Sequence, residues 1–377
     1  MRILHITVRA DRGGGPENIY RLAVLSTAGV ENHVACPRED PYWERYQRLL
    51  GRQRLCEIPH RRFSLAAVAR LVRYCRHHRI ELIHSHGFGA GLYSRLLSLL
   101  VTARVVHTFH GFHLHREQGL GPKIKLLTEK AVRTLTTHYL AVSWTEAAAV
   151  SRALQLPPSR LTVISNGVDT ERFAPAPSMQ PPGEFVILAA LRLSDEKNPL
   201  DLVRILARLK ALFPESRARL RIAGDGPLRP AMEAEVARLG LGECVQLPGW
   251  CDHMETLYAG AHVYLTASRG EGLSLGMLEA FASGLPVVAT SVQGHTDVVC
   301  PGMTGFLFFE GDLDAAAEHL YRLETDAGLY ERLSAAVRQT VVAEFGLAAS
   351  AARHEELFQR LVERHGAGST AEAEVSG

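Results

Sequence analysis

The segment VYLTASRGEGLSLGMLEA, residues 263–280, is the clearest indication of fold class in this chain. Residues 263–267 form a short apolar run, as in a strand whose sheet is covered on both faces. A glycine-containing loop follows, and residues 273–282 then have the composition of a buried helix. A strand, a loop and a helix in this order form the repeating unit of a doubly wound α/β domain.

The same alternation extends from this segment towards both ends of the chain. In the second half the sequence predicts strands at 185–191, 220–223, 245–247, 263–267, 286–289 and 306–308, and helices at 199–212, 228–239, 273–282, 314–323 and 328–343. In the first half it predicts strands at 3–8, 33–36, 82–86, 105–109, 139–142 and 161–164, and helices at 17–28, 65–77, 123–135 and 145–154. We therefore predict an α/β protein of two doubly wound, Rossmann-like domains with parallel sheets and an interdomain cleft for ligands.

A proline-rich break separates the two sets of elements. Pro175, Pro177, Pro181 and Pro182 make residues 167–184 a predicted linker. The predicted divisions are an N-terminal domain at 1–166, this linker, a C-terminal domain at 185–345, a helix at 346–365 that can pack back on the N-terminal domain, and a disordered tail at 366–377.

Charge is divided unequally between the two halves. The chain of 377 residues has a formal net charge of only +2. Residues 1–183 contain 25 Lys and Arg against 13 Asp and Glu, a net of +12, whereas residues 184–377 contain 17 against 27, a net of −10. Such asymmetry indicates different partners for the two halves, with an anionic partner for the first.

Composition excludes several classes of protein. With 46% hydrophobic and 22% charged residues, the chain is neither a disordered tail protein nor a collagen. Its six cysteines are scattered without a Cys-x-x-Cys pair, which is typical of reduced thiols in a cytoplasmic protein. The sequence has no run of 18 apolar residues and no signal-peptide core, so we expect neither a membrane span nor export.

Three loops that follow predicted strands could bind a phosphorylated ligand. The loop Arg12–Pro16 places three glycines before a helix, where backbone N–H groups can approach a phosphate, although a flexible turn would look the same. The segment 268–280 has Glu271 before its helix and Glu279 two turns inside it, for which an N-terminal charge and a solvated face are the plainer explanation. The loop 191–199 places Arg192 and Lys197 at a strand end, where surface charges are the alternative.

The ordered combination of these motifs closely resembles retaining glycosyltransferases of family 4, which have the GT-B fold. The resemblance covers about residues 1–345 and is densest over 160–310. The matching motifs are Asn166–Asp169, Arg192–Lys197, Gly224–Pro227, Glu271 with seven residues to Glu279, Pro286–Ala289 and Gly302–Phe306.

The resemblance implies a role for each site residue. Arg192 and Lys197 would hold the donor diphosphate, Glu271 the donor sugar, and Glu279 the ribose. His110 would touch the transferred sugar near the reacting carbon, which makes it and Glu271 the expected catalytic residues. The remaining implied contacts are backbone at Gly272, Leu273, Ser274 and Leu275, a glycine loop with Gly14 and Gly15 near the diphosphate, and His113 on the acceptor side.

This sequence departs from the family pattern at two places. After Val292 the family often has two glycines and a glutamate, but here Gln293, Gly294, His295 and Thr296 precede Asp297, which could stand in for the glutamate. Ala189 and Ala190 occupy positions where a glycine often precedes the Arg-Leu pair.

A histidine cluster is the main competing signal. Six of the 18 histidines fall within 32 residues, namely His84, His86, His107, His110, His113 and His115. Histidines bind zinc and iron, so a metal-dependent hydrolase is one alternative function. Polar lining of the cleft at strand ends explains most of them without a metal, and we predict no metal or other cofactor. Asp312-Leu313-Asp314 resembles a metal–nucleotide motif, but its place before a helix favours an N-cap.

The basic first half points to the acceptor. Lys123–Arg133 alternates cations with apolar residues, as in helices that lie on membrane surfaces, although a solvated helix face has the same pattern. The segment 107–113 resembles bacterial enzymes that build surface polysaccharide on polyprenyl-diphosphate carriers. We expect such an acceptor, no nucleic-acid partner, and a cytoplasmic location that allows peripheral attachment to the inner face of the membrane.

The predicted function is transfer of a hexose or N-acetylhexosamine from a nucleotide-diphosphate sugar, such as a UDP- or GDP-sugar, to a hydroxyl acceptor with retained configuration. Besides the hydrolase, the alternatives are a GT-B sugar-nucleotide epimerase and a non-catalytic protein that binds sugar nucleotides.

Overall fold

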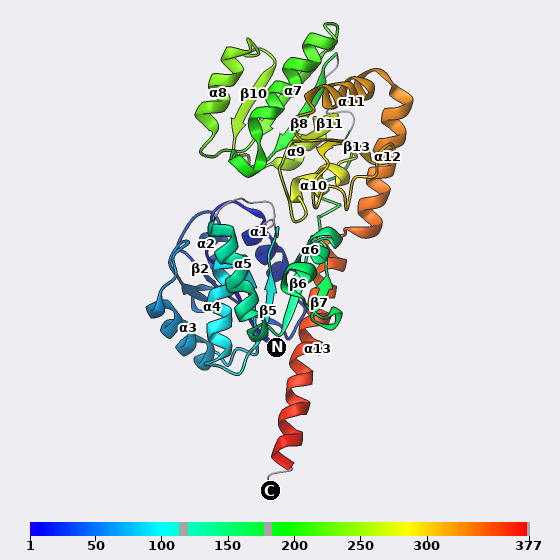
Figure 1. The fold of residues 1–377 in the computed structure, drawn as a ribbon. Coiled ribbons are helices and arrows are strands. Elements are labelled where there is room, and N and C mark those ends of the chain that lie inside the picture. Colours follow the sequence, from blue (N-terminus) through cyan, green and yellow to red (C-terminus); the bar gives the residue numbers. More distant parts are fainter. Residues whose placement is uncertain (113–119, 177–182, 375–377) are drawn as a thin grey trace. The chain divides into compact units, whose positions relative to one another are not determined.

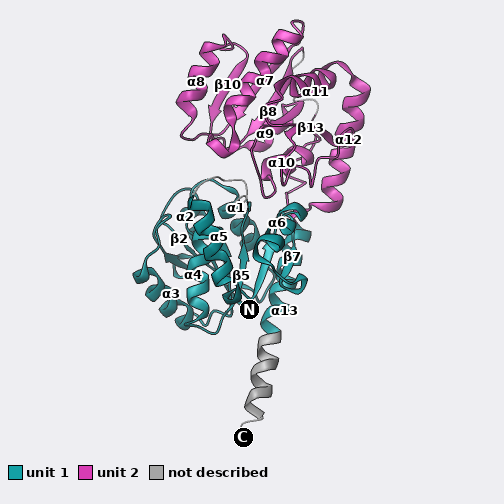
Figure 2. Ribbon diagram, in the orientation of Figure 1, with its two compact units in different colours: residues 1–166, 348–377 teal, residues 167–347 magenta. Residues whose placement is uncertain are grey.

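The computed structural model describes residues 1–112, 120–176 and 183–374, and the side chains of its last helix up to residue 363. The chain forms two compact units, residues 1–166 with 348–377 (unit 1) and residues 167–347 (unit 2), coloured separately in Figure 2. Each unit contains one parallel sheet with helices packed against it (Figure 1).

Unit 1 is built on a seven-stranded parallel sheet in the order β3-β2-β1-β4-β5-β6-β7. Its strands are β1 (Arg2–Thr7), β2 (Glu31–Cys36), β3 (Leu55–Glu57), β4 (Leu82–His86), β5 (Arg104–Thr108), β6 (His138–Ala141) and β7 (Leu161–Val163). Its helices are α1 (Gly14–Val24), α2 (Tyr42–Leu50), α3 (Leu65–His77), α4 (Phe88–Ser98), α5 (Leu120–Val132), α6 (Trp144–Leu154) and α13 (Leu347–Glu374).

Unit 2 has a six-stranded parallel sheet in the order β10-β9-β8-β11-β12-β13. The strands are β8 (Phe185–Ala190), β9 (Ala218–Ala223), β10 (Val245–Gly249), β11 (Val263–Thr266), β12 (Val287–Thr290) and β13 (Gly305–Phe308). The helices are α7 (Pro199–Leu212), α8 (Arg229–Arg238), α9 (Met254–Ala259), α10 (Leu275–Ala282), α11 (Leu313–Thr325) and α12 (Ala327–Glu344).

Strand order places a switch point in each sheet. In unit 1 the order reverses between β1 and β4, and in unit 2 between β8 and β11. Doubly wound sheets bind ligands beyond the carboxyl ends of their strands at such points. The predicted fold class, two doubly wound parallel-sheet domains, is therefore confirmed.

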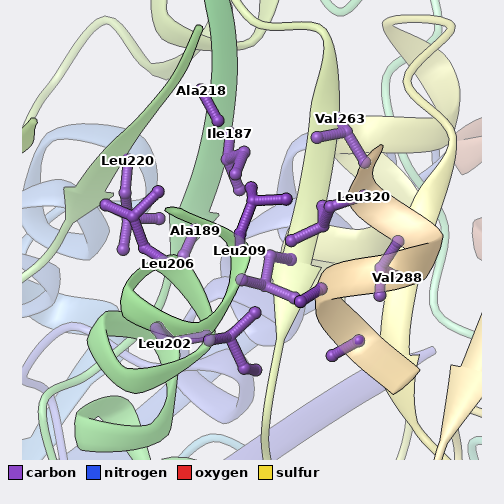
Figure 3. Close-up of a cluster of buried hydrophobic side chains, with 14 of the residues drawn as sticks. Ile187, Ala189, Leu202, Leu206, Leu209, Ala218, Leu220, Val263, Val288 and Leu320 are labelled. Atoms are coloured by element: carbon purple, nitrogen blue, oxygen red, sulfur yellow. The ribbon is translucent and has the colours of Figure 1, made fainter. Parts of the chain in front are cut away.

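Apolar side chains join the helices to the sheets. In unit 2, Leu206 and Leu209 of α7 and Leu320 of α11 pack on strand residues such as Ile187 and Val263 (Figure 3). In unit 1, Leu357 and Phe358 of α13 are buried in a cluster with core residues of the sheet. The last helix thus contributes to the core of unit 1, although it follows unit 2 in the sequence.

Several elements differ from the sequence prediction. Helices α2, α4 and α9 and the three-residue strand β3 are additional elements. Helix α1 begins at Gly14 rather than residue 17, because the N–H of Glu17 already donates to the carbonyl of Gly13. Within the expected linker, Phe173 is buried against Tyr258, their ring centroids 5.6 Å apart.

Parts of two expectations fall on residues that are not described. Residues 177–182 of the linker and 375–377 of the predicted tail lie outside the described residues, as do the side chains from residue 364 onwards. Helix α13 continues through residues 366–374, where the sequence predicts a disordered tail.

Candidate functional site

Two loops meet at the switch point of the unit 2 sheet. One follows β8 and carries Arg192 and Lys197, and the other follows β11 and carries Glu271. The N–H of Arg269 donates to the carbonyl of Glu196 at 2.9 Å, and the Arg269 guanidinium donates to the carbonyl of Asp195 at 3.0 Å. These bonds hold the two loops together, so the predicted diphosphate and sugar residues are brought to one edge of the sheet.

Glu271 and Lys197 form an ion pair that links the two loops. The Lys197 ammonium donates to Oε1 of Glu271, and the Ser268 hydroxyl donates to the same oxygen at 2.9 Å. Burial acts to raise the pKa of the Glu271 carboxyl, but the nearby Lys197 charge and these hydrogen bonds outweigh it and lower the pKa. Glu271 is therefore an ionised acceptor at neutral pH.

Helix α10 begins directly after this loop. The Ser274 hydroxyl caps the helix by accepting the N–H of Met277 at 3.4 Å. The helix start packs tightly, since a Cβ on Gly276 would lie 2.6 Å from the Tyr264 hydroxyl and 3.1 Å from the carbonyl of Ala190. A side chain at 276 would force the Tyr264 hydroxyl to shift, so glycine allows α10 to begin close to the end of β8.

The other residues predicted from this loop lie on either side of the start of α10. Gly272 and Leu273 are buried in the turn, and Leu275 and Glu279 are partly exposed on the helix.

A third segment supports the Glu271 loop from behind. The N–H of Glu271 donates to the carbonyl of Gln293 at 3.2 Å, and a Cβ on Gly294 would lie 2.6 Å from the carbonyl of Gly272. His295 is fully buried next to Glu271, and its Nδ1 lies 2.9 Å from the Thr290 carbonyl. The departure from the family pattern therefore places an imidazole behind Glu271, where sequence reasoning had assigned none. Asp297, the expected stand-in, is partly exposed.

In unit 1, His110 follows β5 with a left-handed backbone, φ 59°. A non-glycine residue rarely adopts this conformation, and such residues cluster at functional sites. Its Nε2 lies 2.8 Å from Nδ1 of His86, and the next N–H, of Gly111, donates to the buried Glu146 carboxylate at 2.5 Å. Sequence reasoning missed Glu146, whose only signal was an acidic residue in the first turn of α6.

The glycine segment of unit 1 lies beside His110. A Cβ on Gly15 would be 3.8 Å from the His110 ring, whereas one on Gly14 would meet nothing within 4 Å. Burial, with a smaller effect of the His354 charge, lowers the pKa of His110 to about 4. The N-terminus of α1 and a neutral imidazole are thus neighbours at the carboxyl edge of this sheet.

The other histidines of the predicted cluster are buried rather than lining a surface. His84 and His107 are fully enclosed, because they lie within strands that are covered by helices, and they contact Thr108 and Ser85 respectively. The prediction that His84 and His107 are polar lining of a cleft is therefore wrong. His113 and His115 lie outside the described residues, so the acceptor-side role of His113 stays a prediction.

Helix α5 turns apolar side chains to solvent. Leu120, Ile124 and Leu127 are 77%, 61% and 65% exposed, and Lys123 and Lys125 are also exposed on this helix. In the described part of the chain no helix is long and apolar enough to cross a membrane.

Two segments whose residue types could bind a metal ion, Asp312-Leu313-Asp314 and the histidine cluster, differ in structure. Asp312 accepts the N–H of Ala315 at 3.1 Å, which confirms it as an N-cap. Among the described residues, His5, His84 and His86 are the group whose nitrogens lie close enough to share a metal ion.

Two family models match the chain. The model described as "Glycosyltransferase Family 4" matches residues 13–172, and that described as "Glycosyl transferases group 1" matches residues 171–340. The two matches together span most of both units.

The chain is also similar in sequence to named glycosyltransferases. A D-inositol 3-phosphate glycosyltransferase of Thermobispora bispora is 32% identical over 76% of this chain and 72% of its own length. A UDP-Gal:alpha-D-GlcNAc-diphosphoundecaprenol alpha-1,3-galactosyltransferase of Escherichia coli is 26% identical over 79% and 80%.

Solved structures share the fold. HepE of Anabaena, in complex with UDP and glucose, has a TM-score of 0.83 at 18% identity, covering 96% of this chain and 100% of its own. The lipopolysaccharide outer core galactosyltransferase WaaB, in its apo form, has a TM-score of 0.72 at 18% identity, with the same coverage.

Proposed function

The chain belongs to the family 4 glycosyltransferases, and from this premise we propose that it moves a sugar from a nucleotide-diphosphate sugar to a lipid-linked glycan with retained configuration. The observation that carries the proposal is the junction of two loops at the β8–β11 switch point. There the loop of Arg192 and Lys197 is bonded to the loop of Glu271, beside the N-terminus of α10.

Negative charge develops on the nucleoside diphosphate as it leaves. Unit 2 lies in the acidic half of the chain, so the few cations at the strand ends have to act locally. Arg192, Lys197 and the positive end of the α10 dipole would stabilise the departing diphosphate without a metal ion. Lys197, now paired with Glu271, would exchange part of that contact for a phosphate oxygen.

The donor sugar and ribose would be held by the two glutamates. Glu271 is ionised at neutral pH and can accept hydrogen bonds from sugar hydroxyls. Glu279, on α10, would accept the ribose hydroxyls, with backbone contacts at Gly272, Leu273, Ser274 and Leu275. The HepE structure, solved in complex with UDP and glucose, supports a UDP-sugar as the donor.

Unit 1 would supply the contact to the reacting sugar. His110 is neutral at pH 7, so it can accept or donate one hydrogen bond without bringing a charge to the sugar. Gly14 and Gly15 at the start of α1 would approach the diphosphate. The acceptor hydroxyl would attack from the face that the diphosphate leaves and pass its proton to an oxygen of the leaving phosphate, which retains the anomeric configuration.

Helix α5 supports a lipid-linked acceptor at an anionic membrane. Its exposed Leu120, Ile124 and Leu127 recur at helical spacing, and Lys123 and Lys125 lie beside them. A helix of this kind can rest on the inner face of the membrane, where each cation contributes about 1 kcal/mol. The E. coli relative is named for a diphosphoundecaprenol-linked acceptor, which is the same chemistry.

A thermal-shift screen of nucleotide-diphosphate sugars tests the donor site. A ligand at 100 times its dissociation constant adds about 2.7 kcal/mol of stability. We expect one donor class to raise the melting temperature of the wild type and to lose most of this effect in Lys197→Ala and Glu271→Ala. Arg217→Ala is the matched control, because Arg217 precedes β9 and so lies at the amino-terminal ends of the strands, away from the proposed site. Equal shifts in all variants would contradict the proposed site.

Acceptor dependence separates transfer from epimerisation. Wild-type protein should release nucleoside diphosphate only when a polyprenyl-diphosphate-linked glycan is present, whereas an epimerase would convert the donor alone.

Flotation with anionic liposomes at low salt tests the membrane surface. The triple variant Leu120→Asn, Ile124→Asn, Leu127→Asn should stay unbound, and Val342→Asn, an exposed position on α12, should bind as the wild type does. Binding by both variants would refute a role for α5.

A further inference from the structure

Three buried histidines converge in the centre of unit 1. His5 lies on β1, and His84 and His86 lie on the neighbouring strand β4. His5 is paired in register with His84, and His86 is two residues further along β4, so the three side chains share one face of the sheet. All are at most 4% exposed.

The outer nitrogen of His5 is fixed as a donor. Its Nε2 lies 3.1 Å from Oδ1 of Asn32, whose amide donates to the Ser26 hydroxyl at 2.6 Å, and that hydroxyl donates to the Leu22 carbonyl at 2.9 Å. Because these hydrogen bonds engage the Asn32 amide nitrogen as a donor, only its carbonyl oxygen faces His5, so Nε2 of His5 carries the proton. The Nδ1 of His5 therefore presents a lone pair towards the other two rings.

The other two rings have the same division of roles. Nδ1 of His86 is engaged with His110 at 2.8 Å, and its Nε2 lies 3.5 Å from Nδ1 of His5. Nε2 of His84 is engaged with Thr108 at 2.9 Å, and its buried Nδ1 has no partner among the described residues. One nitrogen from each of the three histidines lies within 4.8 Å of the others.

We propose that His5, His84 and His86 bind a structural zinc ion in the core of unit 1. Zinc binds imidazole nitrogen at about 2.0–2.1 Å, which in a tetrahedral site separates two ligand nitrogens by roughly 3.4 Å. The 3.5 Å between Nδ1 of His5 and Nε2 of His86 matches this separation. The outer hydrogen bonds to Asn32 and Thr108 are the kind that orient ligating histidines.

A water molecule would complete the coordination. Three protein ligands leave one of the four positions of a tetrahedral zinc ion for a water. With zinc on Nε2 of His86, its Nδ1 must carry a proton and donate to Nε2 of His110. The ion would thereby fix the tautomer of His110. This last step rests on the proposed function, whereas the metal site does not.

Cobalt(II) binding to untagged protein tests the site. We expect the wild type, stripped by chelator, to take up one Co²⁺ per chain and to develop the visible absorption band of a tetrahedral complex. His5→Gln and His84→Gln should lose at least nine tenths of this band. His138→Gln is the matched control, because His138 is also buried in this sheet, where it contacts Thr162 outside the cluster.

Several results would overturn the zinc site. The zinc site is refuted if wild-type protein develops no tetrahedral band or binds clearly less than one Co²⁺ per chain. A band in His84→Gln as strong as that of the wild type would also refute the zinc site. If circular dichroism shows that a variant does not fold, metal analysis of wild-type protein purified without chelator decides: one zinc per chain supports the site, and none refutes it. Loss of donor binding with intact zinc content would contradict only the proposed function.

Discussion

The buried ion pair between Arg95 of α4 and Glu129 of α5 gives a quantitative prediction. The two side chains are 1% and 0% exposed, and the guanidinium donates to both carboxylate oxygens, at 3.0 and 2.6 Å. Burial acts to raise the pKa of the Glu129 carboxyl, and the Arg95 charge offsets this only in part. Removing one partner would leave the other charge buried without compensation.

The expected loss follows from that burial. Glu129→Leu should reduce the free energy of unfolding of unit 1 by about 3–5 kcal/mol, the range for a broken buried pair. For a unit of about 200 residues this corresponds to a fall in melting temperature of roughly 6–20 °C. The double variant Arg95→Met, Glu129→Leu should recover most of the loss, because no charge remains buried.

Denaturant unfolding monitored by circular dichroism measures both variants. Glu44→Leu is the control, since Glu44 forms an exposed i,i+4 pair with Arg48 and should cost less than about 1 kcal/mol. Glu129→Leu as stable as the wild type, or a double variant less stable than Glu129→Leu, would contradict this expectation. The same pair holds Glu129 inwards, so it also keeps the exposed face of α5 turned to solvent.

Other predictions concern packing, the His110 turn and pH. Gly276→Ala should weaken donor binding in a thermal-shift titration, because its Cβ would lie 2.6 Å from the Tyr264 hydroxyl, whereas Gly242→Ala, with nothing within 4 Å, should not. Glu146→Ala should lower kcat at least tenfold with little effect on nucleotide binding, because it releases the Gly111 N–H; unchanged kcat would argue against this. Unit 1 should lose stability as the pH falls from about 6.5 to 4, since burial lowers the folded-state pKa of several histidines to about 4 and the unfolded chain then binds more protons. Urea midpoints measured between pH 7 and 4 would contradict this if they did not fall. These histidines are His33, His138 and His354, which lie outside the proposed zinc site.

Alternation in the sequence was sufficient to predict both sheets. The helix at 199–212 has the predicted bounds, because Pro199 suits the first helical turn and its apolar residues recur on one face. Strand β3 was missed because its three residues end in Glu57 and form no apolar run, whereas the equally short β7 continues into the apolar Ile164. Helix α2 had a usable signal in Tyr42, Trp43, Tyr46 and Leu50, which are all buried on one side.

The site was predictable only where its residues are neighbours in the sequence. The loop around Glu271 follows one strand, so its motif is local. The contact between His86 and His110 joins β4 to the loop after β5, and the bond from Gly111 to Glu146 spans 35 residues. Nothing in the local sequence indicates which side chains will meet across strands, and the role of His295 behind Glu271 depends on the same kind of contact.

Transfer itself is the most direct test of the account. Proton NMR can follow the anomeric signal of a nucleotide-diphosphate sugar in the presence of protein and a polyprenyl-diphosphate-linked glycan. Retaining transfer should give a new glycosidic signal with the donor's anomeric configuration and one nucleoside diphosphate per linkage formed, both lost in Glu271→Ala. An inverted product, or equal turnover in Glu271→Ala, would contradict it.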